Sequence, residues 1–200
     1  MLAQALSLAY AAGLSPYATV AMLGLLKYSG WIGALPGPLD RLTNPWIVGL
    51  AVTLAVIEFL ATLVPWVAST WDAVHTAIRP VAAAALAVAT AWHADPLIIM
   101  MAGLLGGTLG LSTHLTKLGL RVAVDSSPEP VTNGAMNVAE LGVIASMMFF
   151  VWHNPVITLV LALVLLVVML IAVRMIWRMV KRFFAGGWRH PESMEQAPPR

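Results

Sequence analysis

Three ionisable side chains lie close together in the segment TWDAVHTAIRP, residues 70–80. Helical spacing places Asp72, His75 and Arg79 on one face, about one turn apart from each other. A carboxylate, an imidazole and a guanidinium arranged in this way could bind an ion, relay a proton or pair with charges on another helix. We expect Pro80 to end the preceding turn, because proline donates no backbone hydrogen bond. The segment is therefore predicted to be a short interfacial helix whose charged face meets the cytoplasm or a cavity.

A second polar stripe has similar spacing. His114, Lys117 and Arg121 follow one another at helical intervals and share a face. Asp72 is expected to pair with Lys117 or with Arg121. Alternatively, both stripes are interfacial, with long side chains that reach the membrane edge.

Two glutamates in apolar surroundings are candidate functional acids. Glu58 stands in AVIEFLATLVP, where an ionised carboxylate facing lipid would cost roughly 3 kcal/mol. We therefore expect it to face the interior of a helix bundle and to bind a cation, a hydrogen-bond donor or a proton. Glu140, in NVAELGVI, is closer to a helix start. The helix dipole could stabilise its carboxylate there without any functional role. Arg79 is expected to pair with Glu129 or with Glu140.

A polar stretch occupies residues 125–137 between two apolar segments, and consists of Asp125 followed by SSPEPVTNGAMN. Asp125 and Glu129 give it negative charge, and its hydroxyl and amide groups add further oxygen atoms. It could present carboxylates and carbonyls to a cation, or it could be a solvated connector.

Two segments contain residues that break or crowd a helix. Pro16 should break the first apolar segment beside Ser15, which leaves a backbone carbonyl free to bind a ligand. Glycines between 103 and 110 recur at the spacing that lets helices pack closely. The first feature favours a binding site, and the second favours packing.

The tripeptide Gly-Leu-Ser occurs twice, at 13–15 and at 110–112. This echo fits an inverted repeat of three plus three helices, with halves of about 1–93 and 94–182. The alternative is a chance match, since short apolar motifs recur easily.

The composition is that of an integral membrane protein. Hydrophobic residues make up 60% of the 200-residue chain and charged residues 10%, and the mean hydropathy is +0.86. A soluble domain this apolar would lack the polar surface needed to cover its core. The absence of cysteine excludes disulfides and thiolate chemistry. Basic residues cluster at the C-terminal end directly after an apolar helix, so they indicate a cytoplasmic tail rather than a nucleic-acid partner.

We predict an all-α integral membrane protein with about six transmembrane helices in one domain, residues 1–182. Residues 183–200 are polar and proline-rich, and are expected to form a disordered cytoplasmic tail. The basic tail orients the chain N-in and C-in, in a bacterial cytoplasmic (inner) membrane. The apolar segments are about 2–27, 45–64, 80–93, 96–118, 136–152 and 155–180.

The sequence contains no HExxH pair, Walker loop or GxSxG motif. Asp72, His75 and His114 could contribute to a metal site with a glutamate, but the spacing matches no established ligand pattern. The metal and any cofactor therefore stay unknown, and catalysis is the less favoured interpretation.

Several blocks of the sequence resemble the membrane protein family called "domain of unknown function 4126". These blocks are GLSPYATV, then EF…P…WDAVHTAIRP, and then H…K…R…SSPEPVTN, within about residues 10–150. Members of that family typically carry Asp and Lys where this chain has Thr62 and Leu63. A role resting on that acid–base pair is therefore not expected here. The resemblance implies a membrane protein but no particular activity.

The sequence is best interpreted as a small secondary transporter or channel-like carrier for a cation or small polar solute, with Glu58 coupling transport to protons. The alternatives are a structural or partner-binding membrane scaffold and, less favoured, an intramembrane metalloenzyme. The expected partners are the lipid bilayer and a small ion or polar solute, without nucleic acid, and a homo-oligomer is compatible with the sequence. The candidate binding residues are Glu58, Glu140, His114, Ser15, Asp72, His75, Lys117, Arg79 and Glu129.

Overall fold

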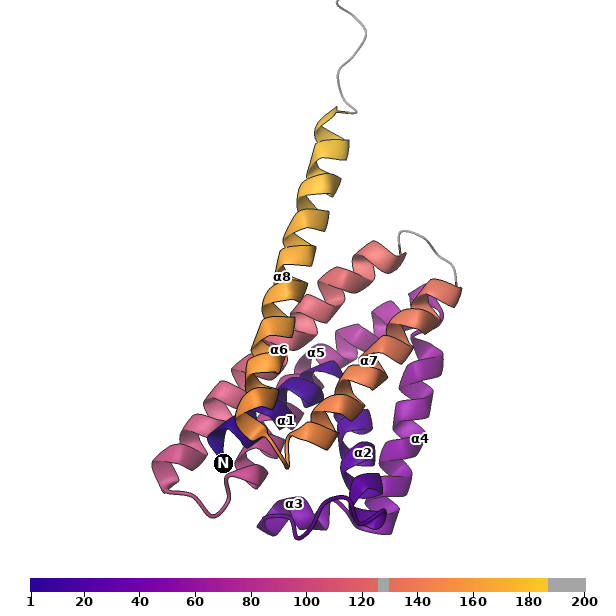
Figure 1. Cartoon of the computed structure of the whole chain (residues 1–200). Helices are drawn as coiled ribbons and strands as arrows, with labels where there is room; N and C mark the ends of the chain where they lie inside the picture. The colour runs from indigo at the N-terminus through magenta and orange to yellow at the C-terminus, as the bar shows by residue number, and fades with distance from the viewer. Residues whose placement is uncertain (126–129, 187–200) are drawn as a thin grey trace, which may run out of the picture.

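The computed structural model describes residues 1–125 and 130–186, which form eight helices. The protein is all-α, as predicted, and Figure 1 shows the helices in one bundle from which the end of α8 projects. The helices are α1 (Leu2–Leu14), α2 (Pro16–Tyr28), α3 (Gly37–Arg41), α4 (Pro45–Ala61), α5 (Pro65–Thr90), α6 (Pro96–Asp125), α7 (Pro130–Phe150) and α8 (Pro155–Gly186).

Proline is the first residue of six of these helices, α2 and α4 to α8. Its fixed φ suits the first turn, and the N–H that it lacks would have no partner there. Polar side chains cap three of the same helix starts, and Ser15 does so at α2. The Oδ1 atom of Asn44 accepts a hydrogen bond from the Trp46 amide (3.0 Å), and that of Asp95 accepts one from the Leu97 amide (2.9 Å).

In the part of the chain that the structure describes, three helical segments are long and apolar enough to cross a membrane: α5, residues Pro96–Arg121 of α6, and residues Pro155–Met175 of α8. Much of the apolar surface of α8 is exposed, for example at Leu161, Val164 and Ile171. Exposed apolar side chains along a helix of this length suit contact with lipid. These features indicate a membrane protein.

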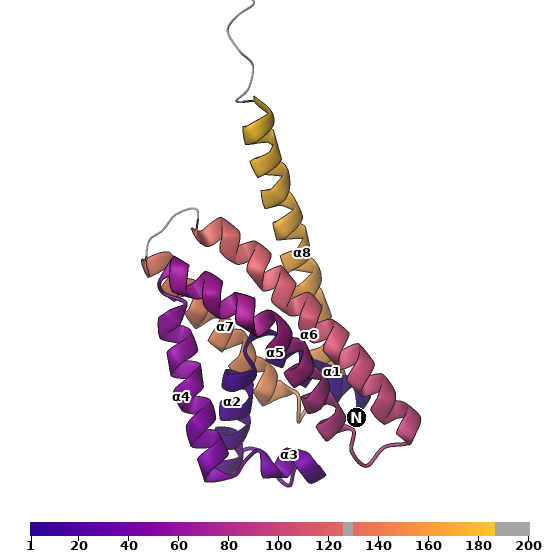
Figure 2. The same ribbon diagram turned by 180° about the vertical axis from the view of Figure 1, so that it is seen from behind.

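α1 and α2 form a re-entrant hairpin rather than one crossing helix. Ser15, between them, is extended (φ −151°, ψ 112°), and Pro16 has no N–H to continue the helix. The start of α1 and the end of α2 lie at the same end of the bundle (Figures 1 and 2), where Leu2 and Ile32 belong to one apolar cluster. Each helix has 13 residues and rises about 20 Å, too short for a ~30 Å bilayer core. The predicted break is confirmed, but the predicted single crossing by 2–27 is wrong.

The hairpin changes the orientation of the chain. Because α1 and α2 enter the bundle and return, α8 ends opposite the start of α1 (Figure 1). The predicted N-in and C-in arrangement with six crossings is therefore wrong, since the start of α1 and the end of α8 lie at opposite ends.

α5 is continuous over 26 residues and passes through Pro80. The separate interfacial helix expected at 70–80 and the short helix expected at 80–93 are both wrong. Membrane helices tolerate proline where neighbouring elements pack around the freed backbone groups. Here α6 packs against the proline turn, and a Cβ on Gly107 would lie 3.5 Å from the carbonyl oxygen of Pro80.

Small residues allow α1 to lie closely against α6, and α6 against α5. A Cβ on Gly13 would lie 2.6 Å from the carbonyl oxygen of Gly110, and a Cβ on Gly110 would lie closer still to the Cβ atom of Ala83. Both distances are shorter than any ordinary van der Waals contact. The packing interpretation of the α6 glycines is therefore confirmed.

α1 and α6 run in the same direction. Ala9 of α1 lies at Gly106 of α6, and the Leu14 carbonyl lies at Lys117, so both helices advance together. Helices related by an inverted repeat run in opposite directions. The Gly-Leu-Ser echo therefore marks two neighbouring parallel helices and does not mark an inverted repeat.

We expect Gly13→Ala to lower the free energy of unfolding by about 1–3 kcal/mol, because its new Cβ would overlap backbone atoms of α6. Thermal unfolding in detergent should show this as a fall in Tm of several degrees. Gly49→Ala on α4 is the matched control, because no atom lies within 4 Å of its Cβ position. An unchanged Tm for Gly13→Ala would contradict the close approach of α1 and α6.

Candidate functional site

Six ionisable side chains meet inside the bundle and form what we call the charge cluster. Three are acidic and three are basic, so their formal charges cancel, as suits groups buried in a membrane interior. The charged face of α5, which was expected to meet the cytoplasm or a cavity, is buried inside the bundle. The charge cluster consists of Glu58 from α4, Asp72 and Arg79 from α5, Lys117 and Arg121 from α6, and Glu140 from α7.

Arg79 is shared between two carboxylates. Its Nη2 atom lies 2.5 Å from Oε1 of Glu58 and 3.2 Å from Oδ1 of Asp72. The Arg79 side chain has no exposed surface, so both ion pairs lie away from solvent. The arginine can therefore keep a partner when either carboxylate is neutralised.

Lys117 joins α6 to the acid of α7 and to the end of α1. Its ammonium group donates to Oε1 of Glu140 (2.6 Å) and to the Leu14 carbonyl (3.0 Å). It also lies 3.9 Å from Oε1 of Glu58. Lys117 thus lies between the two glutamates that the sequence singled out.

Arg121 contacts Asp72 of the charge cluster and polar groups of two neighbouring helices. Its Nε atom lies 3.3 Å from Oδ2 of Asp72, and its Nη1 group donates to the Thr62 carbonyl at 3.0 Å. The Nη2 group donates to the amide oxygen of Asn137 at 3.2 Å, and the amide nitrogen of Asn137 donates to Oγ1 of Thr62 at 2.8 Å. These bonds tie α4, α6 and α7 together beside the acids.

The break between α1 and α2 brings two helix ends to this cluster. At the start of α2, Oγ of Ser15 accepts a hydrogen bond from the Ala18 amide (3.2 Å) and donates to Oε2 of Glu58. At the end of α1, the Leu14 carbonyl accepts from Lys117. The positive end of one helix dipole therefore faces a carboxylate, and the negative end of the other faces an ammonium group.

We expect Ser15→Ala to lower the free energy of unfolding by about 1–3 kcal/mol, because it removes both the helix cap and a donor to a buried carboxylate. Chemical or thermal unfolding in detergent would measure the change. Ser29→Ala is the control, because Ser29 is exposed and its hydroxyl bonds only locally, to the Leu26 carbonyl. Equal losses in the two variants would contradict the role given to Ser15.

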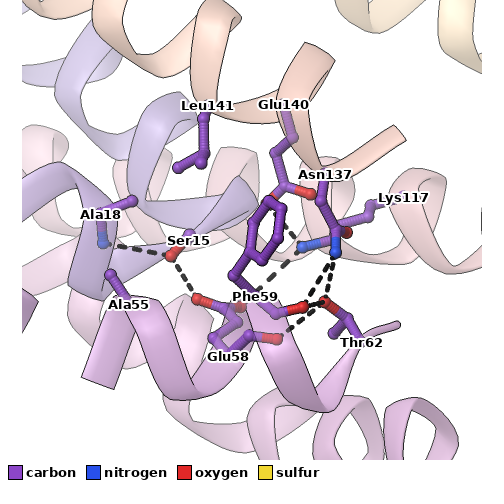
Figure 3. A pocket seen from close by; sticks show the side chains of 10 residues that line it. All are labelled: Ser15, Ala18, Ala55, Glu58, Phe59, Thr62, Lys117, Asn137, Glu140 and Leu141. Atoms are coloured by element: carbon purple, nitrogen blue, oxygen red, sulfur yellow. Dashed lines mark hydrogen bonds and ion pairs between the residues drawn. The ribbon is translucent and has the colours of Figure 1, made fainter. Parts of the chain in front are cut away.

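A cavity of about 20 Å³ lies between the half-helix break and the two glutamates (Figure 3). This volume holds about one water molecule or one small dehydrated ion. The residues around it carry two hydroxyls, two carboxylates, an ammonium group and an amide. The cavity is lined by Ser15, Ala18, Ala55, Glu58, Phe59, Thr62, Lys117, Asn137, Glu140 and Leu141.

His114 has both ring nitrogens engaged. Its Nδ1 atom lies 2.5 Å from Nη1 of Arg79, and its Nε2 atom lies 2.9 Å from Oγ1 of Thr76. Arginine can only donate, so Nδ1 accepts and Nε2 carries the ring proton. The Thr76 hydroxyl in turn donates to the Asp72 carbonyl at 2.9 Å. His114 therefore acts as a neutral link that orients Arg79.

His75 lies beside the charge cluster in an aromatic group of its own. Its ring stacks on Trp71 with centroids 4.5 Å apart, and its Nδ1 atom lies 2.6 Å from the Trp71 carbonyl. That carbonyl can only accept, so Nδ1 donates, and Nε2 lies within hydrogen-bond distance of the Tyr17 hydroxyl, at 2.9 Å. His75 thereby connects α5 to the start of α2.

The structure brings most of the predicted candidate residues to one place. Glu129 lies outside the described residues. Five candidates belong to the charge cluster and three border it. These eight are Glu58, Asp72, Arg79, Lys117 and Glu140 within it, and Ser15, His75 and His114 beside it.

The observed pairings match the predicted ones in part. Asp72 pairs with Arg121, one of its two expected partners, and not with Lys117. Within the described residues, Arg79 pairs with Glu58 and Asp72 and not with the expected Glu140. Glu140 pairs with Lys117 instead.

Sequence reasoning missed two polar residues of the site. Asn137 falls in the stretch interpreted as a polar insert, but residues from Pro130 onward are the first turns of α7. Its position one turn before Glu140 was the available signal. Thr62 lies one turn beyond Glu58, and its hydroxyl donates to the Glu58 carbonyl at 2.7 Å.

A metal site receives no support from the geometry. In residues 1–125 and 130–186, no three His, Asp or Glu side chains lie where they could hold one ion together. The acids of the charge cluster are paired with arginine and lysine instead.

Comparison with known proteins identifies the family of this chain. No curated protein and no solved structure shows significant similarity to the chain. The sequence pattern of the family described as "Domain of unknown function (DUF4126)" matches residues 2–175, which is most of the chain. The protein therefore belongs to the DUF4126 family.

Proposed function

We propose that the protein is a small secondary carrier that moves a cation or a small polar solute across the membrane, with Glu58 as its central acid. One observation carries the proposal: the break in the α1–α2 hairpin lies at a small cavity lined by Glu58, Lys117 and Glu140. Transporters commonly place substrate sites at such half-helix ends, where backbone dipoles face the bound charges.

The pairing of Arg79 supports a role in exchange. The same guanidinium nitrogen contacts Glu58 and Asp72, so neutralisation of Glu58 by a proton or a cation leaves Arg79 paired with Asp72. A site that can lose one negative charge without stranding a buried positive charge can bind and release ions at low energetic cost. This sharing would allow Glu58 to exchange its proton for a cation during transport.

The proposed orientation follows from the basic end of α8. Arg174, Arg178 and Lys181 lie near that end and favour the cytoplasmic side of a bacterial inner membrane. The start of α1 and the loop after α2, which lie at the opposite end of the bundle, would then face outward. The cavity would open to either side as the hairpin moves against α4 and α7.

Flux into proteoliposomes tests the proposal. Wild-type protein should move at least one member of a panel of Na⁺, K⁺, Mg²⁺ and H⁺ above the rate of empty liposomes. Glu58→Gln should abolish that flux, because it keeps the size of the side chain and removes its charge. Asp40→Asn is the control, because Asp40 pairs with Lys27 at the surface, far from the charge cluster.

Folding must be followed in the same samples, by gel filtration and circular dichroism. A folded Glu58→Gln variant that transports normally would contradict the proposal. If wild-type protein moved no member of the panel, the scaffold alternative would gain support.

A further inference from the structure

An apolar groove runs between α7 and α8. It comprises two cavities, of about 450 Å³ and 200 Å³, and both are lined by Ala139, Val143 and Leu165. The larger one extends along α7 as far as Phe150. Ligand sites in proteins typically have volumes of this order and mostly apolar linings.

The smaller cavity reaches the Glu140–Lys117 ion pair, and both of these residues also line the 20 Å³ cavity. The other residues at this end include Tyr10, whose hydroxyl lies 3.5 Å from Sδ of Met169. The groove therefore has an apolar length and a charged end.

Glu140 is the acid of the charge cluster with the most accessible side chain, at 11% exposure against 7% for Glu58 and 2% for Asp72. Its Oε1 atom accepts from Lys117. Among the described residues, its Oε2 atom has no hydrogen-bond partner. Because Glu140 lines the smaller cavity, its carboxylate lies at the charged end of the groove.

Lys117 offers much less to a ligand in the groove. Its ammonium group is almost fully buried and already donates to Glu140 and to the Leu14 carbonyl. An anionic head group would meet the second oxygen of Glu140. The N–H of Lys117 that these two bonds leave over has Oε1 of Glu58 close by, 3.9 Å from the ammonium nitrogen. A cationic head group would meet a complementary charge.

We propose that this groove binds a single-chain amphipathic cation, with its alkyl chain between α7 and α8 and its ammonium group on Glu140. Between Glu140 and Phe150, α7 rises about 15 Å, which suits a medium-length alkyl chain. The site goes beyond the proposed transport function, because binding here requires no movement of solute across the membrane.

Equilibrium binding in nanodiscs tests the proposal, with radiolabelled dodecylammonium as the probe and empty nanodiscs as the blank. Wild-type protein should bind the probe saturably. Unlabelled dodecylammonium should compete at least tenfold better than dodecanol, and dodecanoate should compete least. In Glu140→Gln, the preference for dodecylammonium over dodecanol should disappear.

Gly142→Phe tests the location. Gly142 lines the larger cavity, and no atom lies within 4 Å of its Cβ position, so the new ring fills the groove without displacing the backbone. Gly49→Phe is the matched control, since Gly49 is also a helical glycine with open space around it. We expect at least a tenfold loss of affinity in Gly142→Phe and none in Gly49→Phe.

If Gly142→Phe fails to fold, Ala139→Phe is measured in its place. Ala139 lines both cavities, so the new ring fills the part that they share. Absence of saturable binding, normal binding by the filled variant, or stronger competition by dodecanoate would each overturn the proposal. If wild-type protein transported nothing, the proposed binding site would still stand, because equilibrium binding of the probe involves no flux.

Discussion

Arg79→Met should lower the free energy of unfolding by about 3–5 kcal/mol, the largest loss that we expect from any single substitution in this chain. The side chain is fully buried and contacts Glu58, Asp72 and His114. Without it, the nearest cation to the Glu58 carboxylate is Lys117, 3.9 Å away, and the Asp72 carboxylate keeps an ion pair with Arg121 alone. Thermal and denaturant unfolding in detergent would measure the loss.

Arg41→Met is the control for this substitution, because Arg41 is exposed on α3. Arg79→Lys should be intermediate, since an ammonium group keeps the charge but lacks the fork that reaches both carboxylates and His114. If Arg79→Met were as stable as the control, the charge cluster would not hold the bundle together in the way described.

The second large effect concerns Lys117 and Glu140, which should be strongly coupled. Lys117→Met leaves two carboxylates without this cation, and Glu140→Gln removes the closest partner of the lysine. Each single variant should be destabilised, whereas the double variant should lose less than the sum of the two. We expect a coupling energy of about 1–3 kcal/mol from the double-mutant cycle.

The cycle needs the free energy of unfolding of all four proteins under one set of conditions. Additive losses, with no coupling, would contradict a direct buried ion pair between Lys117 and Glu140. The same cycle between Lys27 and Asp40 should give about 1 kcal/mol or less, because that pair is solvent-exposed.

The charged residues of the site could be predicted because helical periodicity places them on common faces. Asp72 and Arg79, and likewise Lys117 and Arg121, stand at intervals that bring them to one side of a helix. The cost of a lone carboxylate in lipid likewise indicated that Glu58 faces inward. What periodicity cannot provide is the partner on another helix, so the choice among pairings needed the structure.

The helix boundaries show where local rules fail. Pro16 and Pro80 obey the same local chemistry, yet the chain breaks at Pro16 and continues through Pro80. At Pro16 the helix ends are stabilised by Glu58 and Lys117, whereas at Pro80 α6 packs against the turn. These contacts come from distant parts of the sequence, which explains why the re-entrant hairpin and the length of α5 were missed.

Water access to the cavity tests the central claim most directly. The chain contains no cysteine, so an introduced cysteine is the only thiol that a reagent can label. Ala18 lines the cavity at the start of α2, whereas Ala162 of α8 is fully buried and is not among the residues that line the cavity. A small water-soluble thiol reagent should label Ala18→Cys in proteoliposomes from both sides, because a carrier exposes its site to each side in turn. Ala162→Cys should stay unlabelled. If Ala18→Cys were as unreactive as Ala162→Cys, the site would be a sealed structural core, and the carrier account would be contradicted.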